Sequence, residues 1–362
     1  MEMKSSAEVY FGGPDQPAGY LRNVLEEHIA AVPSGGSIDW VTYYFRDLKL
    51  AEALVQARKR GVKVTVSLAG KPRTADANDA VIDMLSGPEG LGDGLRLVTF
   101  PGLPAPPGRT WAPQLHEKLY CFSHPKPIAF IGSFNPSGNQ SEERLDIIRE
   151  IGDQDKGYNA LIGLTDAGLV TQLVKHARNL HETQPGLFYR FSAAANKAIQ
   201  SGDTTIHFWP RTHSHPVMQF LSKVSDNAHV RIFASHIRSK AAVNFMIELA
   251  SRGVYLEIFA EATYRRVTSK VEQRLLSAGI RFKRSRNTDE LPMHLKLVLV
   301  EDRGQAWSIF GSFNWTNPSF WLNHEIAAIS SDPELFRVFS ERCDWIEKKD
   351  FVLPVQTDLV TV

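Results

Sequence analysis

The chain has 362 residues, enough for two domains of ordinary size that each bury a core of their own. Its hydrophobic content of 43% and charged content of 22% are typical of a globular protein in water. The formal net charge of +1 provides no overall basic field, which weakens nucleic acid as a partner but still permits a local basic groove.

Two further features concern the compartment. The only cysteines are Cys121 and Cys343, and we interpret them as isolated thiols in a reducing environment. No run approaches the ~18 apolar residues of a transmembrane helix, and the N-terminal segment lacks the apolar stretch of a secretory signal. We therefore expect a cytoplasmic protein with no transmembrane segment, and the sequence leaves open both its oligomeric state and its contact with a membrane surface.

Strand-like and helix-like segments alternate along the first half. Apolar residues at helical spacing predict helices, and short runs rich in β-branched and aromatic residues predict strands. The predicted strands are Glu8–Gly12, Ile38–Phe45, Val62–Leu68, Leu95–Phe100, Lys118–Phe122 and Ile128–Gly132. The predicted helices are Leu21–Ala31, Leu48–Arg60 and Ala167–His181.

The second half repeats this order. The predicted strands are Thr204–Trp209, Val230–Ser235, Tyr255–Phe259, Ile280–Lys283, Leu295–Val300 and Ser308–Gly311, and the predicted helices are Val217–Ser225 and Lys240–Arg252. In both halves one helix ends in Arg-Gly-Val, at Arg60 and at Arg252. The repetition predicts an internal duplication with α/β layers, which we divide into residues 1–200 and 201–362.

One pattern occurs once in each half: a His, a Lys two positions later, and a hydrophobic strand that ends in Gly-Ser-x-Asn. The first copy comprises His116, Lys118, Ser133 and Asn135, and the second comprises His294, Lys296, Ser312 and Asn314. Because side chains two positions apart on a strand share a face, we expect these groups to converge near the strand ends. Together they suit a phosphodiester, which needs a nucleophile or proton donor, a fixed cation and neutral donors to the phosphate oxygens.

This doubled pattern resembles the signature of the phospholipase D superfamily, which is His-x-Lys, four residues, Asp, and then Gly-Ser-x-Asn. The resemblance covers nearly the whole chain. It implies two similar phospholipase D-like α/β sandwich halves, packed as a pseudo-two-fold intramolecular dimer around one active site. It also implies that one histidine forms a phosphohistidine, with His116 favoured, and that the other protonates the leaving alkoxide and then activates water or an alcohol. No cofactor and no metal is implied.

The chain departs from the family signature at one position of each copy. Ser123 stands where the signature has Asp, and the second copy has Glu301 there, followed by Asp302. We expect this change to alter a strand end and to leave the site intact. Asp146 and Glu325 each lie 11 residues beyond the motif asparagine and precede Ile. This matched offset makes them candidates for the carboxylates that orient the two imidazoles.

The substrate is less well defined by the sequence. Aromatic side chains flank both motifs, and they suit acyl chains or a membrane surface, the stacking of bases, or simple packing beneath the loops. They include Trp111, Phe313, Trp315, Phe320 and Trp321. The candidate phosphate contacts are Arg73, Arg109, Arg265 and Arg266.

Four arginines are few for a nucleic-acid track. We therefore expect a phosphodiester substrate, preferably a phospholipid that is hydrolysed or transferred to another alcohol, as in cardiolipin synthases. A nuclease that cleaves DNA or RNA with the same site is the alternative. A non-catalytic binding protein is the lesser alternative, because both histidines are present.

Overall fold

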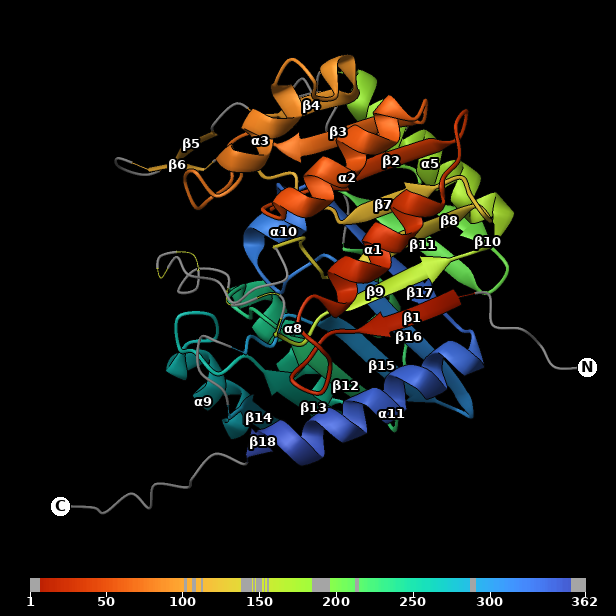
Figure 1. The fold of residues 1–362 in the computed structure, drawn as a ribbon. Coiled ribbons are helices and arrows are strands. Elements are labelled where there is room, and N and C mark those ends of the chain that lie inside the picture. The colour runs from red at the N-terminus through yellow and green to blue at the C-terminus, as the bar shows by residue number, and fades with distance from the viewer. Residues whose placement is uncertain are drawn as a thin grey trace, which may run out of the picture.

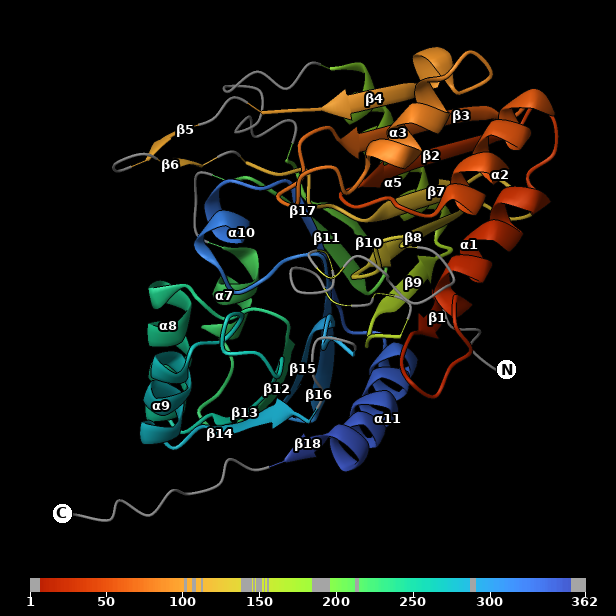
Figure 2. The ribbon, with the colours of Figure 1, turned by 60° about the vertical axis from the view of Figure 1, so that its left-hand side comes forward.

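The structure is a computed structural model. It describes the chain except residues 1–6, 101–102, 106–108, 112, 138–144, 146, 148–151, 153, 155, 184–195, 212–214, 287–290 and 353–362. Two large β-sheets pack together, and helices cover their outer faces and line the interface between them (Figures 1 and 2). A short hairpin projects from the first half near the top left of Figure 1. It consists of β5 (Leu103–Ala105) and β6 (Arg109–Trp111).

The first half contains a sheet of seven strands in the order β1-β9-β8-β7-β2-β3-β4. Its strands are β1 (Ala7–Phe11), β2 (Ser37–Thr42), β3 (Lys63–Ala69), β4 (Leu95–Val98), β7 (Leu119–Phe122), β8 (Ile128–Gly132) and β9 (Ala160–Leu164). The helical elements of this half are α1 (Tyr20–Ala31), α2 (Leu48–Lys59), α3 (Asp79–Ser86), α5 (Ala167–Glu182) and the 3₁₀ turn η1 (Gly92–Gly94).

The second half contains a sheet of nine strands in the order β10-β11-β17-β16-β15-β12-β13-β14-β18. Its strands are β10 (Ile199–Ser201), β11 (Thr204–Trp209), β12 (His229–Ala234), β13 (Tyr255–Ala260), β14 (Arg281–Ser285), β15 (Lys296–Asp302), β16 (Gln305–Gly311), β17 (Glu325–Ser330) and β18 (Phe351–Val352). Its helices are α7 (Pro216–Leu221), α8 (Lys240–Ser251), α9 (Ser269–Ser277), α10 (Asn317–Trp321) and α11 (Pro333–Asp350).

The two sheets correspond strand for strand. Without the edge strands β10 and β18, the second order is β11-β17-β16-β15-β12-β13-β14, which matches the first at every place. The pairs β2–β3 and β12–β13 are parallel, and each is connected by a helix, α2 or α8. Both motif strands, β7 and β15, run antiparallel to their neighbours. The predicted internal duplication and the α/β class are therefore confirmed.

The Arg-Gly-Val steps end these connecting helices. Asp47 caps the start of α2 by accepting a hydrogen bond from the Leu50 amide. At the other end Gly61 has φ +89°, a left-handed conformation that stops a helix and that glycine adopts without strain. Gly253 does the same after α8 with φ +102°. The valine that follows each glycine is buried and leads into the next strand.

The two halves share a core at their interface. One cluster of buried side chains joins the inner faces of both sheets to α5 and α11, through residues such as Leu173 and Phe339. Separate clusters lie under α1–α3 in the first half and under α7–α10 in the second. The halves thus pack as the expected intramolecular dimer, because neither inner face could stay exposed to water without a large loss of hydrophobic burial.

Some elements differ from the predictions. The strand predicted over Ile38–Phe45 ends at Thr42, and the helix predicted over Val217–Ser225 covers Pro216–Leu221. Strand β9 and helix α11 were not predicted. The chain passes from the first sheet to the second between α5 and β10, and the division after residue 200 stays a prediction.

Two further predictions concern the cysteines and membrane-spanning helices. Cys121 lies in β7 and Cys343 in α11, and both are buried, free thiols, as predicted. Among the residues that the structure describes, no helix combines the length and the apolar character needed to cross a membrane.

Candidate active site

Both histidines of the doubled motif lie where the two halves meet. His116 lies three residues before β7 and His294 two residues before β15, and the backbone of each is bonded to the opposite half. The His116 amide donates to the carbonyl of His324 (2.9 Å), and the His294 amide donates to the carbonyl of Tyr158 (3.0 Å). The residues before them form parallel bridges, Leu115 with His324 and Met293 with Tyr158. The interface therefore runs through both motifs.

The glycine of each Gly-Ser-x-Asn is required by a close approach between strands. A Cβ atom on Gly132 would lie 2.1 Å from the carbonyl oxygen of Ala160, and one on Gly311 would lie 2.2 Å from that of Ile326. These distances allow no side chain. The close approach lets the next amide bond the same carbonyl, because Ser133 N lies 3.0 Å from Ala160 O and Ser312 N lies 2.9 Å from Ile326 O.

The motif serines hold the residues that contact the histidines. The Ser133 hydroxyl donates to Oδ1 of Asn159 (3.1 Å) and accepts from the Ala160 amide (3.0 Å). In the second half the Ser312 hydroxyl donates to Oε2 of Glu325 and accepts from the Ile326 amide (3.1 Å). We expected these hydroxyls to donate to phosphate oxygens, but their single proton points to the neighbouring residue in both halves.

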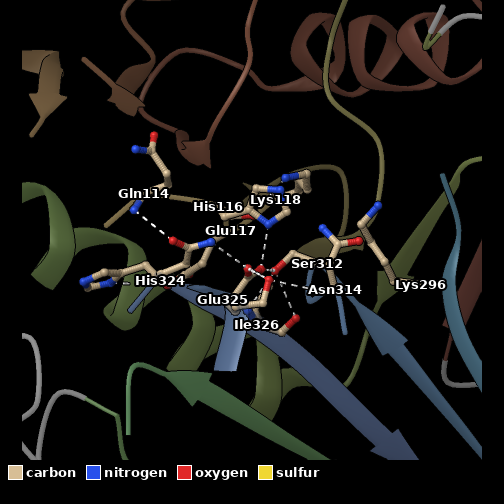
Figure 3. Close-up of polar contacts among 12 residues, drawn as sticks. Gln114, His116, Glu117, Lys118, Lys296, Ser312, Asn314, His324, Glu325 and Ile326 are labelled. Carbon is tan, nitrogen blue, oxygen red and sulfur yellow. Dashed lines mark hydrogen bonds and ion pairs between the residues drawn. The ribbon is translucent and has the colours of Figure 1, made fainter. Parts of the chain in front are cut away.

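Each imidazole is oriented by a residue from the opposite half. Nδ1 of His116 lies 2.8 Å from Oε2 of Glu325, and Figure 3 shows the ring pointing down onto this carboxylate. Nδ1 of His294 lies 2.8 Å from Oδ1 of Asn159. Because an acceptor at Nδ1 holds the proton there, Nε2 of each neutral ring keeps a free lone pair.

Of the two candidate orienting carboxylates, Glu325 contacts a motif histidine. Glu325 contacts His116 as a carboxylate should. Asp146 lies outside the described residues, and the imidazole of His294 contacts Asn159 instead. Asn159 corresponds to Glu325 in the fold. Asn159 lies directly before β9, which pairs with β8, and Glu325 begins β17, which pairs with β16 in the same register. The sequence does contain a signal for Asn159. It is a polar residue directly before the apolar strand Ala160–Leu164, just as Glu325 directly precedes the apolar residues of β17.

Both partner residues are fully buried and fixed. Oε1 of Glu325 accepts from the Ser319 hydroxyl (2.7 Å) and from the Asn323 amide group (3.3 Å). The Asn159 amide group donates to the carbonyl of Gln154 (3.2 Å). Because that bond uses the Nδ2 atom, the orientation that directs Oδ1 of Asn159 at His294 is the consistent one.

Both motif lysines are buried, and each ammonium group contacts the backbone of its own motif. Nζ of Lys118 donates to the carbonyl of His116 (2.8 Å), and Nζ of Lys296 donates to the carbonyl of His294 (2.7 Å). Burial lowers the pKa of Lys118 to about 7, against the opposing charges of Glu325 and Glu117. Burial and the charge of Lys118 hold the pKa of Lys296 well below its usual range. An anion that entered the site would relieve this repulsion.

Charged groups of each half-site affect the pKa of the histidine in the other. Burial lowers the pKa of His116 to about 4, although the Glu325 carboxylate opposes the shift. Burial also lowers the pKa of His294 well below its usual value, and nearby positive charges lower it further. Those charges include Lys118 and His116 of the other half.

The motif asparagines lie beside these groups. Oδ1 of Asn135 lies 3.5 Å from the Tyr44 amide, and its Nδ2 lies 3.5 Å from Oε1 of Gln154. Asn314 is half-buried beside Lys296 (Figure 3), and its backbone amide donates to the Ser319 hydroxyl (3.2 Å).

The residues that depart from the signature lie away from this site. Ser123 follows the far end of β7, where its hydroxyl accepts from the Ser37 amide (2.7 Å). At the matching end of β15, Asp302 accepts from the Ser225 amide (3.0 Å), and Glu301 is largely exposed. These side chains hold strand ends at a distance from the motif histidines, at the opposite ends of β7 and β15.

Most of the aromatic residues around the second motif pack beneath the loops, which is one of the alternatives that the sequence left open. Phe313, Trp315 and Phe320 are buried and pack against one another beneath the loops, whereas the side chain of Trp321 is 43% exposed. The side chains of Arg109 and Trp111 lie outside the described part of the chain. Within the described residues, no three His, Cys, Asp or Glu side chains are grouped as metal ligands.

The comparisons with known proteins agree with this geometry. The sequence matches the family described as "Cardiolipin synthase, PLD-like domain" twice, over residues 33–161 and 218–346. A mitochondrial cardiolipin hydrolase of Danio rerio is 33% identical over 93 residues, which are 26% of this chain and 39% of that protein. The matched region therefore spans well under half of this relative.

Two solved structures share the fold at low sequence identity. Phosphatidylserine synthase of Haemophilus influenzae Rd KW20 superposes with a TM-score of 0.65 and 13% identity, covering 95% of this chain and 87% of that one. Polyphosphate kinase from Porphyromonas gingivalis gives a TM-score of 0.60 and 13% identity, covering 93% of this chain and 50% of that one. The double family match covers more than half of the chain, one copy in each half, and the protein belongs to the phospholipase D superfamily.

Proposed function

We propose that this protein is a phosphodiesterase or phosphatidyltransferase that acts on phospholipids through a phosphohistidine intermediate. One observation carries the proposal. Two imidazoles, His116 and His294, each have Nδ1 occupied by a partner from the opposite half, so that both Nε2 atoms are available to one substrate. Two buried lysines next to them provide positive charge for the phosphate oxygens.

In the first step, Nε2 of His116 attacks phosphorus and the bond from phosphorus to the leaving oxygen breaks. The attacking ring becomes a phosphoimidazolium and gains positive charge. Glu325 is the only one of the two Nδ1 partners that carries a negative charge, so it stabilises this species at His116. This asymmetry supports His116 as the nucleophile.

His294 is the proton donor in the same step. A neutral amide at Nδ1 does not stabilise its imidazolium form, which is therefore a strong acid toward the departing alkoxide. The bound phosphodiester, which is an anion, favours protonation of this ring before the reaction. In the second step, water or an alcohol gives its proton to Nε2 of His294 and attacks phosphorus, and the bond between phosphorus and His116 breaks.

Exposed apolar side chains at the edge of the site support a lipid substrate. Leu48, Tyr264 and Trp321 are 44%, 60% and 43% exposed. Each belongs to a segment that follows a strand ending at the site, namely β2, β13 or β16. Such residues suit a protein that works against a membrane surface from the cytoplasmic side. The alternative is a nuclease, since Trp321 could equally stack on a base.

A substrate panel tests the proposal. Purified protein is incubated with vesicles of phosphatidylcholine or phosphatidylglycerol, with single- and double-stranded DNA and with RNA, with and without glycerol as acceptor. We expect release or transfer of the lipid headgroup, unchanged by EDTA, because the lysines and amides supply the charge stabilisation. Cleavage of nucleic acid with lipid untouched would establish the nuclease instead.

Single substitutions test the paired histidines. His116→Ala and His294→Ala should each reduce turnover by ~10³-fold or more, because each ring is needed in both steps. The matched control is His124→Ala, an exposed histidine in the loop between β7 and β8, which should keep wild-type turnover. Turnover near the wild-type rate in both site variants would refute the mechanism.

A further inference from the structure

The residue between the histidine and the lysine of the first motif is a buried carboxylate that the proposed reaction does not use. Glu117 is 0% exposed and stands one position from both His116 and Lys118. A carboxylate that is taken out of water is costly unless other groups balance its charge. The groups that contact Glu117 are therefore part of the surroundings of the first motif.

Two histidines, one from each half, contact this carboxylate. Oε2 of Glu117 lies 2.9 Å from Nε2 of His176 in α5, and Oε1 lies 3.8 Å from Nδ1 of His324, which precedes β17. Both rings are fixed by stacking. His176 stacks on Phe208 of the second half, with ring centroids 3.9 Å apart, and His324 stacks on Phe100 of the first half, at 4.8 Å. These contacts join the two halves beside the first motif.

His324 is directly connected to the residue that orients His116. It precedes Glu325 in the chain, and its backbone lies beside the first motif. The amide of His324 donates to the carbonyl of Gln114 (2.8 Å), and its carbonyl accepts from the amide of His116 (2.9 Å). Figure 3 shows the ring of His324 pointing away from the carboxylate of Glu325. Of these two successive side chains, one therefore contacts Glu117 and the other contacts His116.

The second motif has no charged pair at the matching positions. Leu295 takes the place of Glu117, and Tyr158 takes the place of His324 in the matching backbone bridge. Both are buried in the core at the interface. The fold thus accepts apolar packing here, and a buried charged pair is rarely more stable than apolar groups of similar size. Packing alone does not account for Glu117 and His324.

The charged pair lies on the side of the site where the orienting residue is a carboxylate, and the apolar pair lies where it is a neutral amide. We propose that Glu117 and His324 are positioning residues. Their contact fixes residues 323–325 against the first motif and thereby holds the carboxylate of Glu325 at Nδ1 of His116. This inference rests on the proposed function, in which His116 is the nucleophile.

Glu117 also acts on Lys118 through its charge, which raises the pKa of that ammonium group against the effect of burial. A substitution of Glu117 alone removes both effects. A substitution of His324 leaves the charge of Glu117 in place and removes only the contact. Comparing the two substitutions therefore separates the positioning of Glu325 from the charge of Lys118.

The first test copies the second motif into the first. Glu117→Leu and His324→Tyr are combined, and turnover of phosphatidylglycerol vesicles and urea denaturation are measured. We expect a stability near that of the wild type and a kcat that is ~10–100-fold lower with KM little changed, because the partner of a reacting imidazole is displaced while the substrate still binds. A kcat within about threefold of the wild type would overturn the proposal.

Two single substitutions keep the test decisive if the combined variant does not fold. Glu117→Gln and His324→Gln each remove the charged contact, and each should lower kcat by ~10-fold or more. Because both remove the same contact, the double variant should lose about as much as the more impaired single variant. A loss equal to the product of the two single losses, or a loss in Glu117→Gln alone, would overturn the role of the contact.

The matched control is Glu257→Gln. Glu257 of β13 is a carboxylate with 4% exposure that contacts a histidine in the same way, with Oε2 2.8 Å from Nε2 of His229. His229 begins β12 and pairs with Glu301, toward the end of β15 opposite Lys296. This variant should keep the wild-type kcat. An equal loss of kcat there would show a general effect of removing a buried charged pair and would overturn the specific role of Glu117.

A spectroscopic measurement separates this inference from the proposed function. Long-range proton–nitrogen NMR correlation of the histidine rings reports which nitrogen carries the proton and needs no substrate, and His116→Gln identifies the signals of His116. We expect the proton on Nδ1 of His116 in the wild type and a mixture of Nδ1 and Nε2 in His324→Gln. An unchanged His116 ring in His324→Gln would overturn the positioning role alone. The expected change in a protein that turns over no phospholipid would support the contact and refute the proposed function.

Discussion

The imidazole of His116 is fixed by the carboxylate of Glu325, which lies in the other half of the chain, with Nδ1 and Oε2 2.8 Å apart. In the opposite direction His294 contacts Asn159 at the same distance, but through a neutral amide. The two half-sites are thus equal in geometry and different in charge. This difference gives each histidine its own part in the proposed reaction.

Replacing Glu325 by Gln should lower kcat by ~10²–10⁴-fold, because the side chain keeps its shape but no longer stabilises the positive charge on His116. Steady-state kinetics on phospholipid vesicles would measure this, and circular dichroism would show whether the fold is kept. Acid-quenched mixtures should also contain less phosphohistidine. A kcat within threefold of the wild type would contradict the assigned role of Glu325.

Replacing Asn159 by Asp should shift the pH dependence of kcat/KM. A carboxylate at Nδ1 favours the imidazolium form of His294 and raises its pKa, so the proton donor stays protonated to higher pH. The alkaline limb should therefore move upward by ~1–3 units. Asn159→Ala is the control, since it removes the contact without adding charge. If the alkaline limb moved as far in Asn159→Ala as in Asn159→Asp, the added charge would not be the cause.

Replacing Gly311 by Ala should destabilise the second half, because the new Cβ atom would lie 2.2 Å from the Ile326 carbonyl oxygen. We expect a loss of about 3 kcal/mol in the free energy of unfolding, measured by urea denaturation. Gly279→Ala is the matched control. It has φ +76° with open space around the added Cβ atom, and should lose only about 1 kcal/mol. Equal losses would contradict the close-approach argument.

Replacing His215 by Leu should weaken the acid sensitivity of the fold. His215 is buried among Trp209, Phe313 and Phe320, and burial lowers its pKa to about 3. Below pH ~6.5 the unfolded chain binds a proton at this residue that the folded chain does not, so stability falls as the pH drops toward 3. In His215→Leu the free energy of unfolding should therefore fall less steeply with decreasing pH, by about 1.4 kcal/mol per pH unit.

Urea denaturation at pH 6.5 and pH 5 measures the dependence for His215. Phe320→Leu is the control, because it disturbs the same packing without removing a group that titrates. A pH dependence that is reduced equally in both variants would show that packing, and not the proton, is responsible.

The sequence predicted the duplication and the motifs because both depend on local patterns. Alternating buried strands and amphipathic helices appear in the same order twice, and the Arg-Gly-Val steps mark equivalent helix ends at Gly61 and Gly253. These features need no knowledge of which strands pair. The two-residue period of a strand was expected to bring His116 and Lys118 together, but both residues precede β7, which begins at Leu119.

The partner of His294 depends on long-range pairing and could not be read in the same way. A count of 11 residues from the motif asparagine reaches Glu325 in the second half. In the first half the chain between Asn135 and β9 is longer, so that Asn159 stands 24 residues beyond Asn135. Only the pairing of β9 with β8, through the Ser133 amide and the Ala160 carbonyl, identifies Asn159 as the equivalent residue.

The roles of the serines and of the aromatic residues also depend on three dimensions. Ser133 and Ser312 were expected to face the substrate, but their hydroxyls donate hydrogen bonds to Asn159, directly before β9, and to Glu325 at the start of β17. For Phe313 and Trp315 the sequence left a role at the site and packing beneath the loops both open, and the structure buries them. The spacing of residues in the sequence predicts on which face of a strand a side chain lies. It does not predict which residue of a neighbouring strand will contact that side chain.

The crossed partners of the two histidines have a consequence for how such a protein can change. If a single half assembled as a symmetric homodimer, any substitution beside one imidazole would appear beside the other as well. Joining two copies in one polypeptide removes that constraint, so Glu325 and Asn159 can differ and each ring can specialise. The same crossing means that an isolated half would hold a histidine without its orienting residue and would be inert.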